Sequence, residues 1–301
     1  MYYDFMNEFT GHLWKDEYKI GEKTVDAQHY QLFFNVEKLL YIIRNHDALR
    51  QKKECESIIN FLLEYTVQHF ADEERLQLET GYVSYELHKK IHADFTNTVL
   101  LYKKRLDEAY SEEELEHFTG TLLSWLVFHV LGCDSKIPKN EPIGSSLVFG
   151  NAEDSMRSVA QAILTGLYKI EIKESKSCMY KGFIEGDCFI RTIVKGSKNY
   201  LIIYGISKKL AVEVFRRMAG IDLSYMDEPD DLAKSAFLEL GNIFSTYIIG
   251  AMTEDSTMAY TVTHELFIGK YDDKTYKTNN NILLDVNTVC GDMEILLTCM
   301  N

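Results

Sequence analysis

Proline is scarce in this sequence, with three among 301 residues, and the six cysteines form no CxxC pair. Without a regular cysteine framework, a disulfide-stapled scaffold is not expected, and the thiols are predicted to be reduced, as in the cytoplasm. No apolar run reaches the ~18 residues of a membrane span, and the first residues lack the basic and apolar segments of a signal peptide. We therefore expect a cytoplasmic protein that does not enter the membrane.

Basic residues are also few: 32 lysines and arginines stand against 46 aspartates and glutamates, a formal charge of −14. Nucleic-acid grooves and anionic membrane surfaces are bound by lysine and arginine patches. The charge therefore argues against nucleic acid and against a membrane surface as partners. A length of 301 residues predicts about two domains, each able to bury its own core. An apolar content of 46% is normal for a soluble globular protein.

Two of the three prolines, Pro138 and Pro142, lie in a short segment that is also rich in glycine and serine. Such a composition between two periodic regions indicates a linker. We place the first domain at residues 1–137, the linker at 138–150 and the second domain at 151–301.

Helical periodicity dominates the first domain, where apolar residues recur at 3- and 4-residue steps in four segments. One follows His29, the second ends near Gly81, and the third begins near His88. The fourth opens with a capping box at Ser111 and Glu114. Four amphipathic helices with short connections predict an all-α antiparallel four-helix bundle.

The second domain mixes helical and alternating patterns, which predicts an α+β fold. The expected helices are a segment from Asn151 to about Leu167, one from Ser207 to about Ala219, and one over roughly 231–252. The expected strands lie within 176–206 and near 257–268, 281–289 and 292–299.

Five histidines and two carboxylates of the first domain continue its apolar helix stripes. Spacings of three or four residues place such side chains on one helix face, and imidazole with carboxylate suits a non-haem iron pair. A set of hydrogen-bonded core histidines is the alternative, and the in-phase spacing on four helices favours the metal. The candidate ligands are His29, His69, Glu73, His88, His92, His129 and Asp134, the last expected where the fourth helix ends.

The first domain resembles bacterial hemerythrin over residues 10–136. The resemblance rests on the motif Trp14-x3-Tyr18-x2-Gly21-x4-Asp26-x-Gln28-His29 and on the HxxxE, HxxxH and WxxxHxxxxD elements that follow it. It implies two irons joined by an oxo or hydroxo bridge, with Glu73 and Asp134 as bridging carboxylates. His88, His92 and His129 would complete one iron, and His29 and His69 would leave the other an open position for O2.

By the same resemblance, Trp125, Leu126 and Val130 would form a dry pocket beside that open position. The sequence departs from the family pattern after Asp134, where Pro138 is expected to cut the usual helix continuation short.

A polar stripe marks the helix expected over 231–252. Ser235, Glu239, Asn242 and Thr246 share one face, which on its own most often means a solvated surface. Together with Gly250-Ala251 and the closing strand, the stretch Ser235-Ala-Phe-Leu-Glu239-Leu-Gly-Asn242 resembles the CheC/CheX chemotaxis phosphatases over 151–301. A single ExxN helix is more like CheX.

That resemblance implies an enzyme that removes phosphate from the aspartyl phosphate of a CheY-type response regulator. Asn242 would orient the attacking water, Glu239 would engage a lysine of the regulator, and the partner would supply Mg²⁺. It also implies a homodimer paired through sheet edges.

The sequence thus predicts an oxygen- or redox-sensing di-iron domain that regulates a CheX-like phosphatase. The alternative is an oxygen-storage or scavenging hemerythrin with a catalytically silent dimerisation domain. The fused phosphatase-like helix favours sensing.

Overall fold

The computed structural model describes residues 13–45, 52–144, 151–220, 229–253, 261–269, 271 and 281–300. Its contacts divide the chain into two units, residues 1–143 and 144–301. The predicted domains also cover stretches outside the described residues, and these include 145–150 of the expected linker and 257–260 of the expected strand. Among the described residues, no helix is long and apolar enough to cross a membrane.

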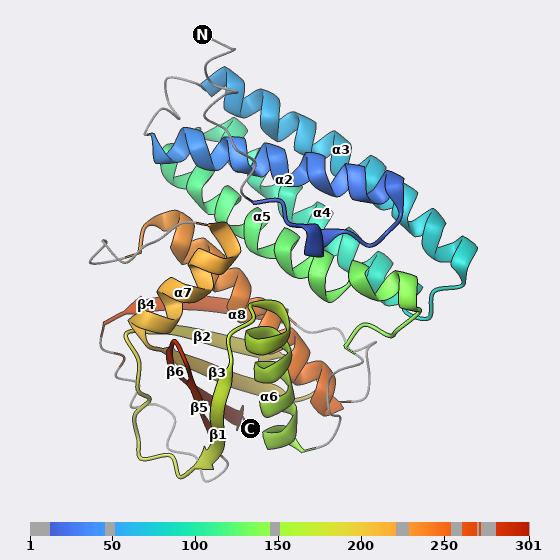
Figure 1. Ribbon diagram of the computed structural model, residues 1–301. Helices are drawn as coiled ribbons and strands as arrows, with labels where there is room; N and C mark the ends of the chain where they lie inside the picture. The colour runs from blue at the N-terminus through green and yellow to red at the C-terminus, as the bar shows by residue number, and fades with distance from the viewer. Residues whose placement is uncertain are drawn as a thin grey trace. The chain divides into compact units, whose positions relative to one another are not determined.

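The first unit is a four-helix bundle, as predicted (Figure 1). Helix α2 packs against α3 and α5, and α4 packs against the same two helices, so the four enclose a common core. A 3₁₀ turn, η1 (Asp16–Tyr18), precedes the bundle, and a second, η2 (Asp134–Lys139), follows it. The bundle helices are α2 (Lys23–Arg44), α3 (Lys52–Thr80), α4 (Tyr85–Glu108) and α5 (Glu112–Gly132).

Local signals fix the ends of these helices. The Ser111 side chain accepts a hydrogen bond from the Glu114 backbone N–H at 3.1 Å, which satisfies one of the unpaired amides at the start of α5. Gly81 follows α3 with a φ of +67°, a left-handed conformation that glycine adopts without steric cost. Both features match the expected starts and stops.

The segment after α5 differs from the expected linker. Residues 138–143 group with the first unit, and two hydrogen bonds tie them to the α3–α4 connection. Asn140 Oδ1 accepts from the Val83 N–H at 3.0 Å, and the Ile143 N–H donates to Ser84 Oγ at 3.0 Å. Pro138 lies within the 3₁₀ turn η2, and the two prolines of the segment do not reveal these anchors.

The second unit is an α+β domain around one six-stranded antiparallel sheet, in the order β1-β5-β6-β3-β2-β4 (Figure 1). Helix α6 packs on β5, α7 on β6, and α8 on β2 and β4. The helices are α6 (Ala152–Ala160), which continues as a π-helical turn η3 (Gln161–Leu167), α7 (Lys208–Ala219) and α8 (Asp231–Thr253). The strands are β1 (Ile172–Cys178), β2 (Cys188–Lys195), β3 (Asn199–Ile206), β4 (Thr261–Ile268), β5 (Asn281–Thr288) and β6 (Gly291–Met300).

Strand β1 begins earlier than the predicted strand region, which starts at residue 176. Its sequence, Ile-Lys-Glu-Ser-Lys-Ser-Cys, lacks apolar alternation. Among the described strands it forms an edge of the sheet and pairs with β5 alone. Lysine and other polar side chains are common on such edges, where they discourage pairing with other chains. A pattern search for buried strands therefore passes over it.

Helix α8 is seated closely on the sheet by one glycine. A Cβ built on Gly241 would lie 2.6 Å from Ile190 Cγ2 of β2, so only a glycine permits this approach. Ser245, four residues further along α8, shares a buried 2.7 Å hydrogen bond with Tyr204 of β3. These two contacts hold the helix at a defined distance and rotation over the sheet.

We expect Gly241→Ala to lower the free energy of unfolding by about 1–2 kcal/mol, because overpacking against the stiff Ile190 exceeds the helix-propensity gain. Gly250→Ala is the matched control on the same helix, since its added Cβ meets nothing within 4 Å. It should raise the free energy of unfolding by about 0.5–1 kcal/mol. Chemical denaturation measures the free energy of unfolding of both variants. Equal stabilisation by the two alanines would contradict the close approach of α8 to the sheet at Gly241.

Candidate functional site

The structure brings all seven predicted metal ligands together in the core of the bundle. Each bundle helix contributes at least one, and the 3₁₀ turn η2 contributes the last. Every one of these polar side chains is at most 2% exposed. They are His29 on α2, His69 and Glu73 on α3, His88 and His92 on α4, His129 on α5 and Asp134 on η2.

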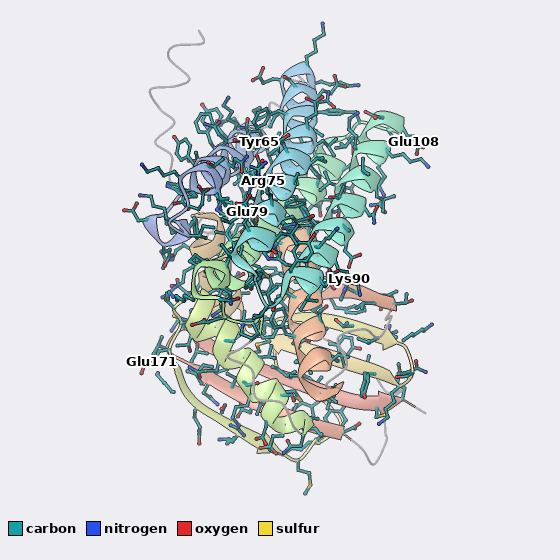
Figure 2. The ribbon with its side chains drawn as sticks, turned by 90° about the vertical axis from the view of Figure 1, so that its right-hand side faces the viewer. Tyr65, Arg75, Glu79, Lys90, Glu108 and Glu171 are labelled. Atoms are coloured by element: carbon teal, nitrogen blue, oxygen red, sulfur yellow. The ribbon has the colours of Figure 1, made fainter. Side chains whose placement is uncertain are left out.

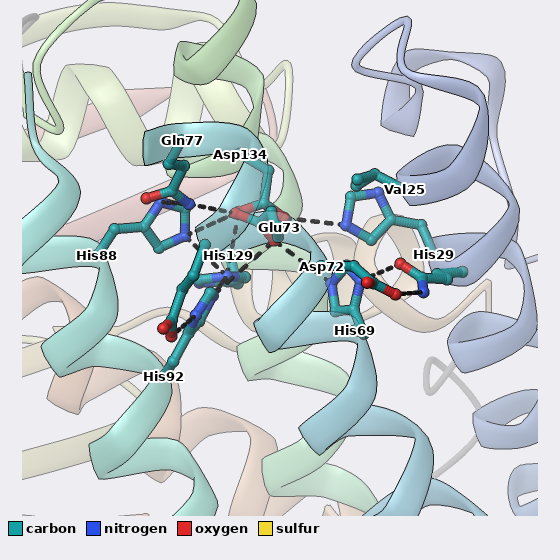
Figure 3. A network of polar contacts seen from close by, with 12 residues as sticks. Val25, His29, His69, Asp72, Glu73, Gln77, His88, His92, His129 and Asp134 are labelled. Atoms are coloured by element: carbon teal, nitrogen blue, oxygen red, sulfur yellow. Dashed lines mark hydrogen bonds and ion pairs between the residues drawn. The ribbon is translucent and has the colours of Figure 1, made fainter. Parts of the chain in front are cut away.

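The seven residues form two four-membered groups that share Glu73. In each group the potential ligand atoms all lie within 4.8 Å of one another. Figure 3 shows three histidines on one side, two on the other, and the carboxylates between them. The three-histidine group is Glu73, His88, His92 and His129, and the two-histidine group is His29, His69, Glu73 and Asp134.

Both carboxylates face both groups. Asp134 Oδ1 lies 3.0 Å from His129 Nε2 and 3.1 Å from His88 Nε2, while its Oδ2 lies 3.1 Å from His29 Nε2. Glu73 divides its oxygens in the same way, with Oε1 3.3 Å from His88 Nε2 and Oε2 3.4 Å from His69 Nε2. One oxygen of each carboxylate is thus directed to each group.

The spacing of the imidazole nitrogens fits a common metal ion. His129 Nε2 lies 2.9 Å from His92 Nε2 and 3.1 Å from His88 Nε2. Two ligands at right angles, each about 2.1 Å from a first-row transition metal, lie about 3.0 Å apart. Three imidazoles that converge in this way, rather than turning toward separate partners, match a coordination sphere.

The carboxylates also fit a metal because hydrogen bonds from the described residues leave three of their four oxygens unsatisfied. Both oxygens of Asp134, Oε2 of Glu73 and both ring nitrogens of His29 are buried without a well-aligned hydrogen bond among the described residues. A buried polar atom without a partner is costly. Coordination by a cation would remove that cost.

Burial sets the ionisation of the ligands. It lowers the pKa of His129 to about 4, against the opposing effect of Asp134, and holds the pKa of His69 and His92 well below the usual range. Burial and the charge of Asp134 raise the pKa of Glu73 well above its usual range. His69, His92 and His129 are therefore neutral, as metal-ligating histidines must be.

For Asp134, burial acts to raise the pKa, but His129, His29 and His88 outweigh it and hold that pKa well below its usual range. Asp134 therefore stays anionic in the core. Imidazoles around the anionic Asp134 and around Glu73, which would lose its proton when a cation binds, are a donor set for a divalent or trivalent cation.

Side chains outside the predicted set orient the ligands. Gln77 Nε2 donates to Glu73 Oε1 at 2.7 Å and lies 2.9 Å from His88 Nδ1. Because Gln77 lies four residues after Glu73 on the same stripe of α3, the periodicity could have identified it. Such outer contacts fix ligand orientation.

Aromatic rings surround the three-histidine group. Trp125 stacks on His129 with ring centroids 4.2 Å apart and on Phe95 at 3.6 Å, and Phe70 stacks on His92 at 3.8 Å. Leu126 and Val130, the other predicted pocket residues, are 2% and 1% exposed. Aromatic rings therefore lie against two of the three histidines of this group, and the predicted pocket residues Leu126 and Val130 are buried.

The polar stripe of α8 is not uniformly solvated, unlike an ordinary surface face. Ser235 is buried, Glu239 and Asn242 are half-buried, and Thr246 is exposed. Asn242 Nδ2 lies 3.4 Å from Glu239 Oε1 and 3.5 Å from Oε2. Burial raises the pKa of Glu239 to about 7, and the contact with Asn242 opposes that rise.

A four-helix bundle built around a buried set of imidazole and carboxylate ligands defines the class of the first unit. Sequence comparisons identify known proteins that are similar to this unit. Bacteriohemerythrin of Pseudomonas aeruginosa is 32% identical over 125 residues, 41% of this chain and 76% of that protein. Myohemerythrin of Riftia pachyptila is 26% identical over 129 residues, 43% of this chain and 92% of that protein.

Through its N-terminal part, the chain belongs to the bacteriohemerythrin family. No family model matches the sequence. The C-terminal half is similar to a solved chemotaxis protein CheX from Desulfovibrio desulfuricans, which is 18% identical. That likeness has a TM-score of 0.41 and covers 50% of this chain and 99% of the CheX chain.

Proposed function

We propose that the first unit binds two irons and senses oxygen or redox state, and that this signal regulates a phosphatase in the second unit. The observation that carries the metal proposal is the sharing of Glu73 by two ligand groups, with Asp134 in contact with histidines of both. Two metals bound this way would be close enough to act as one redox unit. Metal analysis of the purified protein tests it, with two irons per chain expected.

The two groups are unequal, and this inequality supports binding of a small ligand. One group holds three histidines and the other holds two, so the second group has one protein donor fewer. An iron pair with an open position supplies reversible binding of O2 and exchange of electrons. His29 and His69 would hold the iron with the open position, and both side chains are at most 1% exposed.

Filling the proposed pocket should impair oxygen binding. We expect Leu126→Trp and Val130→Phe to slow O2 binding to the iron-loaded, reduced protein at least tenfold, because the added rings would occupy the space that the ligand needs. Stopped-flow absorption measures the rate. Leu115→Phe is the overpacking control: Leu115 is also buried on α5, but about 21 Å along the helix from His129. Unchanged rates in both pocket variants would contradict this location.

In the second unit, we propose that Glu239 and Asn242 act on the aspartyl phosphate of a CheY-type response regulator. Asn242 orients the water, and Glu239 engages a lysine of the partner. Phosphoryl transfer depends mainly on positioning and electrostatics, so two side chains on a rigid helix suffice when the partner supplies Mg²⁺. The seating of α8 by Gly241 and Ser245 supports such positioning.

We further propose a cytoplasmic homodimer that pairs through the sheet of its second unit. Phosphate release from a phosphorylated CheY-type protein is the test of the enzymatic part. If the wild-type protein releases no phosphate from any response regulator of its own genome, while it binds oxygen reversibly, the second unit is a silent dimerisation domain and the protein stores or scavenges oxygen.

A further inference from the structure

A carboxylate outside the ligand set contacts one ligand histidine. His92 Nδ1 lies 3.0 Å from Oε1 of Glu74, the residue after Glu73 on α3. The Glu74 side chain is 21% exposed, whereas that of His92 is 2% exposed. His92 Nε2 faces the ligand cluster, 2.9 Å from His129 Nε2. With a metal on Nε2, the proton would reside on Nδ1 and would be donated to Glu74.

Among the residues that the structure describes, neither Nδ1 atom of the two-histidine group has a direct carboxylate partner of this kind. His69 Nδ1 meets an amide oxygen, Gln28 Oε1, at 3.2 Å, and Gln28 Nε2 donates to Asp72 Oδ2 at 2.8 Å. The negative charge is thus one residue further away. His29 Nδ1 has no hydrogen-bond partner in the described part of the chain.

In the three-histidine group, the other two Nδ1 atoms also lack a carboxylate. His88 Nδ1 faces the amide of Gln77 at 2.9 Å, and His129 Nδ1 has no hydrogen-bond partner among the residues described. Within those residues, His92 is therefore the only one of the five ligand histidines whose Nδ1 donates directly to a carboxylate.

We propose that Glu74 is a positioning residue that makes the iron of the three-histidine group harder to reduce than its neighbour. The inference rests on the proposed iron pair. A carboxylate that accepts the distal N–H of a ligand imidazole fixes its tautomer and increases its electron donation. Greater donation stabilises the ferric over the ferrous state, and Glu74 supplies it to one group only.

This asymmetry determines where the first electron is lost on oxidation. The three-histidine iron would become ferric first, while the two-histidine iron, which has the open position, would stay ferrous. Glu74 would thereby preserve the ligand-binding oxidation state at the open position in the half-oxidised protein. The electron passes to an external acceptor, and the proton remains between His92 Nδ1 and Glu74.

A redox titration of the iron-loaded full chain tests the proposal, with mediators carrying electrons from an electrode and absorption as the readout. Glu74→Gln keeps the size of the side chain but removes its charge. The reduction potential of the lower-potential step should rise by about 59 mV, which corresponds to a tenfold change in the ferric-to-ferrous affinity ratio. Glu79→Gln removes a charge from an exposed position on the same helix (Figure 2) and should leave both steps unchanged.

A second variant keeps the test decisive if Glu74→Gln loses iron. Gln28→Glu combined with Asp72→Asn moves a carboxylate into direct contact with His69 at constant charge. The reduction potential of the higher-potential step should then fall by a similar amount. If both reduction potentials stay unchanged in every variant that holds two irons, Glu74 does not have the proposed role. A wild-type protein that binds no iron pair would instead overturn the proposed function.

Discussion

Glu73→Gln is expected to reduce bound iron from two per chain to none. Glu73 belongs to both ligand groups, so a neutral amide in its place removes an anionic donor from each iron at once. Gln preserves the volume of the side chain and can still contact Gln77, so the bundle should fold. Metal analysis after anaerobic loading measures the loss. Glu64→Gln, at an exposed position of the same helix, is the matched control and should retain both irons.

The stability of the same variant should depend on the metal. In the iron-free wild type, burial and the charge of Asp134 raise the pKa of Glu73, so the ligand core carries a costly carboxyl pair. Without iron, Glu73→Gln should therefore unfold at the same temperature as the wild type or higher. With iron, the wild type should be the more stable protein, since ligands that bind only the folded state stabilise it. A variant that is less stable in both states would indicate a purely structural role for Glu73.

Asn242→Ala is expected to reduce dephosphorylation of a CheY-type partner at least a hundredfold. No other side chain on the stripe matches the family's water-positioning amide. If the proposal holds, the loss should appear in kcat, because the amide would act on the attacking water rather than on partner binding. Glu239→Ala should raise KM as well, since it removes the proposed contact with a lysine of the partner.

The fold should survive the Asn242 substitution. Its side chain contacts Glu239 at the long distances of 3.4 and 3.5 Å, so the free energy of unfolding should change by less than about 1 kcal/mol. Thr246→Ala, on the exposed end of the same stripe, is the control and should keep full activity. Full activity in Asn242→Ala, with the wild type active, would show that the catalytic residue lies elsewhere.

The ligand set could be predicted from the sequence because helix periodicity is a strong geometric constraint. A residue such as His92, four positions after His88 and in phase with an apolar stripe, can only face the core of a bundle. Asp134 was expected where the fourth helix ends, and α5 does end at Gly132, just before the 3₁₀ turn that carries it.

What the sequence could not provide depends on contacts between distant segments. The direct link from His92 to Glu74 requires the relative rotation of α3 and α4, which periodicity alone does not fix. The same holds for the anchoring of Asn140 to the α3–α4 connection. The partial burial of Glu239 and Asn242 differs from an ordinary solvated face for the same reason: it follows from packing around α8 rather than from the pattern of the helix itself.

The most direct test of the central claim is the rate of phosphate release from a phosphorylated CheY-type partner, measured with the iron-loaded protein in its reduced, oxygen-exposed and fully oxidised forms. We predict that the rate differs between the reduced form and at least one of the others. The difference should disappear in Glu73→Gln, which holds no iron. Equal, measurable rates in all three forms would contradict the proposal that the iron centre regulates the phosphatase.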